Sequence, residues 1–154
     1  MRYITITFTI LIFCSCTGLS QSIGSNGYNE NLQKTIKHLI SGDKLTIEQI
    51  QDAIPKKEDD FFTFYSYTEK DEKSNAAFYR LNSLILKHAM DGENSILKPY
   101  LLLSEFVDGE YAESYFEDVE AVIEKNREVF CKLFPQLPKK KVSRLSDLYD
   151  KYCK

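Results

Sequence analysis

The sequence predicts an all-α protein, a compact irregular bundle or short array of six to eight helices that follows a cleaved export signal. Three observations lead to this prediction. The 154 residues include only 6 Gly and 4 Pro, too few for the many turns of an all-β fold. Apolar residues recur at helical spacing through most of the chain. Gly42, Gly92 and Gly109 each fall just after a predicted helix, where a left-handed residue commonly ends one.

The first 20 residues are expected to be a signal peptide that takes no part in the fold. Arg2 supplies a positive charge, and the uncharged stretch Tyr3–Phe13 is shorter than the roughly 20 residues that span a bilayer. Small residues at the end of this segment predict cleavage after Ser20. The chain is therefore expected to be exported to the periplasm, the cell envelope or the medium.

A second interpretation of the same segment is a lipoprotein signal that ends at residue 15. Phe13-Cys14-Ser15-Cys16 resembles a bacterial lipobox, with a small residue before Cys16 as the lipidation candidate. The match departs from the usual pattern by having Phe where Leu is commonest, followed by Cys. A lipid on Cys16 is the only attachment to a membrane that the sequence predicts.

After the signal, residues 21–29 are expected to form a flexible tether and residues 30–154 a single helical domain. Ser, Gly and Asn dominate the tether. The first helix is predicted over Glu30–Ser41, with Leu32, Ile36 and Leu39 on one face. The second is predicted to start at Thr46, where Gln49 completes a capping box, and to stop at Pro55.

Phe61–Tyr67 is rich in aromatic residues and fits either a strand or a helix. We predict a helix because no second strand of matching length is evident. Its rings are expected in the core, and an aromatic platform for a sugar or peptide is the functional alternative. Ser74 is predicted to cap the next helix, over Asn75–Asp91.

Ile96–Val107 is the most apolar stretch outside the N-terminus and is predicted to be a central buried helix. Proline cannot donate a backbone hydrogen bond, so the regular helix is expected to begin with Pro99 in its first turn. The following stretch, Glu110–Phe134, has a continuous apolar stripe interrupted at Asn126, which predicts a break there, with Asn126 as the cap of a second segment. A last helix is predicted from about Ser143.

Cys131 and Cys153 are the only ordinary thiols that either processing route leaves in the mature chain. An even pair in an oxidising compartment favours a disulfide, which would fasten the last helix to its neighbour. Two buried free thiols are the alternative. With two His and two such Cys, no metal site is predicted, and no phosphate-binding, dinucleotide-binding or nucleophile-elbow motif is found, so no cofactor is expected. The formal charge of -3 gives no attraction to nucleic acid.

The most conspicuous charged feature is a run of carboxylates between Glu105 and Glu124 that contains no Lys or Arg. Several of them are spaced three or four residues apart, so they share one helix face. Tyrosines beside them favour partner binding over simple solvation, because Tyr is enriched at interfaces. The predicted binding surface consists of Glu110, Tyr111, Glu113, Tyr115, Glu117 and Glu120.

Two functions are consistent with this pattern. The first is a non-enzymatic helical module of the bacterial envelope that binds a basic protein partner through the acidic surface, for example as an inhibitor of a basic toxin. The second is a small helical hydrolase of cell-wall or other glycans, in which a cleft carboxylate such as Glu105 or Glu110 has a raised pKa and acts as an acid. We prefer the first because no catalytic motif accompanies the carboxylates.

Overall fold

The computed structural model describes residues 23–154, and all regular secondary structure within this range is helical. The predicted all-α class is thus confirmed. The α-helices are α1 (Ile23–Ser41), α2 (Ile47–Ala53), α3 (Glu58–Tyr65), α4 (Glu72–Met90), α5 (Asn94–Leu102), α6 (Gly109–Lys125), α7 (Arg127–Leu133) and α8 (Ser146–Cys153). Single 3-10 turns follow α3, α5 and α7 and precede α8. The predicted signal peptide and lipidation at Cys16 lie outside the described residues.

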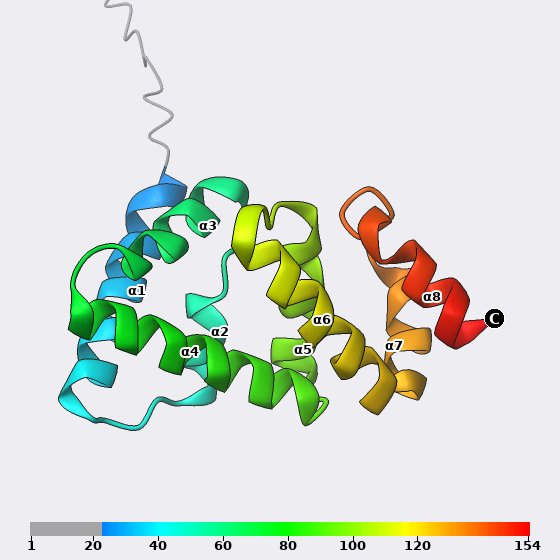
Figure 1. Ribbon diagram of the computed structural model, residues 1–154, viewed down its shortest axis with the longest axis horizontal. Coiled ribbons are helices and arrows are strands. Elements are labelled where there is room, and N and C mark those ends of the chain that lie inside the picture. Colours follow the sequence, from blue (N-terminus) through cyan, green and yellow to red (C-terminus); the bar gives the residue numbers. More distant parts are fainter. Residues whose placement is uncertain (1–22) are drawn as a thin grey trace, which may run out of the picture.

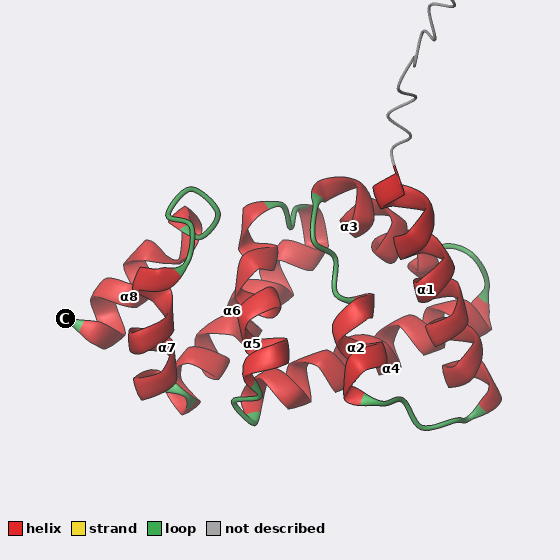
Figure 2. Ribbon diagram, turned by 180° about the vertical axis from the view of Figure 1, so that it is seen from behind, coloured by secondary structure: helices red, strands yellow, loops and turns green. Residues whose placement is uncertain are grey.

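The helices form an elongated array (Figure 1). α1, α2 and α3 lie at one end, α5 and α6 in the middle, and α7 and α8 at the other end, while α4 extends from the first group to the middle. Seen from behind, α2 and α5 come to the front (Figure 2). One apolar core follows the whole array, from Leu32 in α1 to Leu145 before α8. No helix within residues 23–154 is long and apolar enough to cross a membrane.

α1 begins at Ile23, seven residues before the predicted start at Glu30, so the helix includes Gly24 and Gly27. The glycines there disfavour a helix locally. Tyr28 outweighs them, since its ring is buried and its hydroxyl donates a hydrogen bond of 2.8 Å to the carbonyl oxygen of Ala53 at the end of α2. A tertiary contact therefore extends the helix through a segment of low intrinsic propensity.

The next two helices follow their local signals. The capping box at the start of α2 is confirmed. The backbone nitrogen of Gln49 lies 3.3 Å from Thr46 Oγ1, and the backbone nitrogen of Thr46 lies 2.8 Å from Gln49 Oε1. The helical interpretation of Phe61–Tyr67 is also confirmed, as α3 and the 3-10 turn Ser66–Thr68. α3 starts earlier than predicted, at Glu58, with three carboxylates in its first turn that suit the positive end of the helix dipole.

The predicted starts of α4 and α5 are wrong. α4 is capped by Asp71 instead of Ser74, because the Asp71 carboxylate accepts a 3.0 Å hydrogen bond from the Ser74 nitrogen. α5 begins at Asn94, and Pro99 lies inside it. Apolar residues on both sides of Pro99 are buried. Proline has no N–H to donate to the carbonyl of Ser95, and Ser95 is partly exposed. Core burial outweighs the cost of the proline.

The predicted break at Asn126 is confirmed, because α6 ends at Lys125 and α7 starts at Arg127. The predicted side-chain cap of α7 is not formed. The Asn126 amide instead donates to the carbonyls of Ala89 and Met90 at the end of α4, at 3.3 and 3.0 Å, and to Val122 at 3.1 Å. Gly92 follows α4 with a φ of 74°, and a Cβ there would lie 2.7 Å from Asn126 Oδ1. This amide joins α4 to the α6–α7 corner.

Candidate functional site

α6 carries all six residues of the predicted binding surface and has a buried and an exposed side. Its buried stripe is Tyr111, Ala112, Tyr115, Val119, Val122 and Ile123. The carboxylates of Glu110, Glu113, Glu117 and Glu124 lie on the exposed side. Within residues 23–154, none of these four forms an ion pair with Lys, Arg or His. We call these four residues the acidic face.

The two tyrosines predicted to contact a partner lie in the core. Tyr111 is 8% exposed, and its hydroxyl donates to Asn82 Oδ1 at 2.8 Å. Tyr115 is 2% exposed, and its hydroxyl donates to the carbonyl of Tyr100 at 2.8 Å. Burial raises the pKa of both phenols well above the usual range. Their assignment to the binding surface is wrong, because both belong to the apolar stripe of α6.

Glu120 also differs from its predicted role. Its carboxylate lies 2.6 Å from Lys151 Nζ and accepts a hydrogen bond from the Tyr152 hydroxyl at 3.1 Å. These hydrogen bonds from α8 lower the pKa of Glu120. Asp118, on the same helix, shows the opposite shift, since partial burial and then the charge of Glu117 raise its pKa. Glu120 thus contacts α8 and is paired with a cation, which leaves it out of the acidic face.

Glu105 and Glu110, the two carboxylates of the hydrolase hypothesis, lie in different surroundings. Glu105 lines a shallow hollow of about 250 Å³ with Lys57, Glu58, Phe106 and Lys141. Lys141 Nζ lies 2.7 Å from Glu105 Oε2, so this carboxylate is held by an ammonium group and is poorly placed to deliver a proton. Glu110 is exposed and does not line the hollow that contains Glu105.

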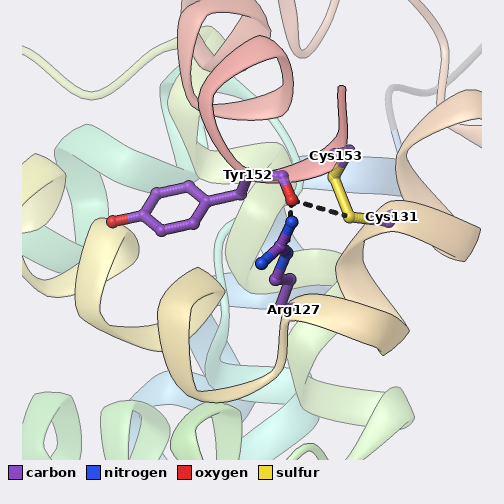
Figure 3. The surroundings of a disulfide bond; sticks show 4 residues. All are labelled: Arg127, Cys131, Tyr152 and Cys153. Carbon is purple, nitrogen blue, oxygen red and sulfur yellow. Dashed lines mark hydrogen bonds between the residues drawn. A yellow bond between two sulfur atoms is a disulfide. The ribbon is translucent and has the colours of Figure 1, made fainter.

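The predicted disulfide is formed between Cys131 of α7 and Cys153 of α8, with a Cα separation of 5.5 Å (Figure 3). The carbonyl oxygen of Tyr152 beside it accepts a hydrogen bond from the Arg127 guanidinium. Cys131 Sγ is 3.8 Å from the same oxygen, but a disulfide sulfur has no hydrogen to donate. The bond and the Arg127 contact together fasten α8 to α7.

Sequence reasoning missed a set of exposed aromatic residues outside α6. Phe62 of α3 is 57% exposed and Tyr79 of α4 is 58% exposed. Tyr65 of α3 is partly exposed, and its ring contacts those of Phe61 and Phe78. The aromatic run at residues 61–67 drew attention to α3, but its pattern does not show which rings face out. Helical spacing places Tyr79 beside Asn75, Asn82 and Ser83, off the apolar stripe of α4, and this was the available signal. We call Phe62, Tyr65 and Tyr79 the aromatic ridge.

No protein family model, curated protein or solved structure matches this chain. Function must therefore be argued from the side chains themselves. Within residues 23–154, no group of three or more His, Cys, Asp or Glu is arranged to hold a metal ion.

Proposed function

We propose that this chain is an exported, non-enzymatic helical protein that binds a basic protein partner through the acidic face. The observation that supports the proposal is the charge of Glu110, Glu113, Glu117 and Glu124, four exposed carboxylates on one helix with no cation paired to them in the described part of the chain. On α6 the proposed contact is made by carboxylates and not by Tyr111 or Tyr115, because both tyrosines are buried.

The acidic face favours a cationic partner on physical grounds. Glu110 and Glu113 are three residues apart, and Glu113 and Glu117 are four apart, so each pair repels by a few tenths of a kcal/mol on a helix. A basic surface removes this repulsion when it binds. Exposed like charges also raise the rate at which an oppositely charged partner associates, and salt screens the effect over about 10 Å.

The hydrolase alternative has weaker support. A glycoside hydrolase needs one carboxyl group that holds a proton and a second across the scissile bond. Glu105, which lies in a hollow, forms an ion pair with Lys141, and Glu110 is exposed outside that hollow. The non-enzymatic proposal therefore accounts for the carboxylates of α6 better.

Charge reversal tests the proposal. The tagged mature protein is used to capture partners from the envelope fraction of the native host, and each captured protein is then purified and its affinity measured. Glu113→Lys with Glu117→Lys is expected to weaken binding at least tenfold, and added salt to weaken binding of the unaltered protein. The matched control, Glu30→Lys with Glu128→Lys, changes the net charge equally at exposed positions on α1 and α7 and should bind normally. Equal affinities for both double variants would refute the proposal.

Export is tested separately by intact mass of the protein from membrane and soluble fractions of the native host. Cleavage after Ser20 gives a chain that starts at Gln21, whereas lipidation gives a heavier chain that starts at Cys16. A cytosolic chain that retains Met1 would contradict export.

A further inference from the structure

The aromatic ridge is anchored on buried rings that join α3, α4 and α6. Phe61 stacks against Tyr65 with ring centroids 6.1 Å apart, and Tyr65 meets Phe78 edge-on at 6.0 Å. The exposed rings sit on this pair, since Phe62 is 6.1 Å from Phe61 and Tyr79 is 5.3 Å from Phe78. The three rings of the ridge are therefore connected through the buried rings of Phe61 and Phe78.

The acidic face adjoins this ridge at Glu110. Phe61 and Tyr111 are 5.3 Å apart, which places the first turn of α6 beside α3, as Figures 1 and 2 also show. Burial raises the pKa of Tyr65, and Glu110, Tyr79 and Glu69 raise it further, in that order. Tyr65 of the ridge thus lies near two carboxylates, those of Glu110 and Glu69.

Exposed aromatic rings with carboxylates around them favour one kind of side chain. Arginine stacks its planar guanidinium on the face of a Tyr or Phe ring and also bonds to carboxylate oxygens, whereas lysine offers a compact, strongly hydrated charge. An acidic partner would be repelled by Glu69 and Glu110. A purely apolar partner would leave both carboxylates unpaired and partly desolvated.

We infer that the aromatic ridge, with Glu69 and Glu110, is a docking surface for an arginine-bearing segment of the partner protein. The inference rests on the proposed function and extends it from α6 onto α3 and α4. The acidic face supplies attraction for any basic segment, and the ridge supplies the preference for arginine over lysine.

Two peptides of equal charge separate these contributions. The probes are fluorescein-labelled hexapeptides that alternate Gly with Arg or Gly with Lys, and a Gly–Glu hexapeptide is the control. Binding to the mature protein is measured by fluorescence anisotropy at low salt and located by amide chemical shifts. The Arg peptide is expected to bind more tightly than the Lys peptide and to shift the amides of Phe62, Tyr65 and Tyr79.

Variants then assign the preference to the ridge. Phe62→Ser with Tyr79→Ser is expected to weaken binding of the Arg peptide about tenfold, the effect of two exposed cation–π contacts, and to bring the Arg and Lys affinities together. Ile40→Ser with Val129→Ser removes two other exposed apolar side chains and should leave the preference unchanged. Glu113→Lys with Glu117→Lys should weaken both peptides and keep their ratio.

Each contrary result has a distinct meaning. If both basic peptides bind equally and the ridge variant changes neither affinity, the inference is overturned while the acidic face stands. If neither basic peptide binds better than the Gly–Glu peptide, the proposed function is overturned with it. If a chitin tetrasaccharide shifts the ridge amides and the Arg peptide does not, the ridge is a glycan platform and the inference is wrong.

Discussion

Removal of the Cys131–Cys153 disulfide is expected to lower the free energy of unfolding by about 3 kcal/mol. The two cysteines are 22 residues apart in sequence, and the loss of chain entropy on closing a loop of that length gives this magnitude at 25 °C. The perturbation is Cys131→Ala with Cys153→Ala, which removes the covalent link without adding a polar group. Reduction of the unaltered protein should have the same effect.

The loss is expected to fall mainly on α8, which has no fully buried side chain of its own. α8 is held otherwise by the Phe134–Tyr149 stack at 4.6 Å and by the Lys151–Glu120 ion pair on the surface. Surface ion pairs contribute little to stability. Amide exchange should therefore accelerate in α8 well before it does in α4.

Urea unfolding, followed by circular dichroism, measures the effect. With a slope of about 1–3 kcal/mol per M, the midpoint should fall by about 1–3 M in the double alanine variant. Reductant should not change the variant further, which controls for other effects of the reagent. Equal midpoints for the oxidised protein and the variant, at equal slopes, would refute the reasoning.

Three further predictions concern the core and the α4 end. Asn126→Ala should lower the free energy of unfolding by about 2 kcal/mol, since the Met90 carbonyl loses its amide donor. Asn126→Asp should lower it further, because a carboxylate would face the same carbonyl oxygens. A smaller loss for the Asp variant in urea unfolding would contradict this. Gly92→Ala should lower the free energy of unfolding by about 1–3 kcal/mol, because position 92 has a positive φ and the new Cβ would contact Asn126. A thermal midpoint equal to that of the unaltered protein would argue against this. Stability should fall above pH 10 by about 1.4 kcal/mol per pH unit for each buried phenol. Burial raises the pKa of these phenols in the folded state above the unfolded value, so the unfolded chain releases their protons first. Part of the tyrosinate absorbance should therefore rise only as the chain unfolds, and a complete rise before unfolding would refute this. The phenols concerned are Tyr28, Tyr100, Tyr111 and Tyr115.

Features set by neighbouring residues could be predicted from the sequence. The capping box of Thr46 and Gln49, the glycine at position 42 with its φ of 84°, and the break at Asn126 all depend on residues a few positions apart. The pairing of Cys131 with Cys153 was also predictable, because few thiols were available to choose from.

Features that depend on distant contacts were missed. The start of α1 depends on Tyr28 meeting Ala53, and the continuation of α5 through Pro99 depends on core burial around it. The exposure of Tyr111 was misjudged because its hydroxyl partner, Asn82, lies 29 residues earlier in the chain. The helical spacing that includes Tyr115 in the apolar stripe was the available signal, and it should have outweighed the nearby carboxylates.

The close approach of Gly92 to Asn126 also constrains how this fold can diverge. A side chain at position 92 would occupy the space of the Asn126 amide oxygen, while loss of the amide opens that space and leaves the end of α4 without its donor. The two positions therefore share a constraint although they are 34 residues apart in the sequence. Among related chains, a larger residue at 92 is expected only together with a smaller or different one at 126, so this pair should covary.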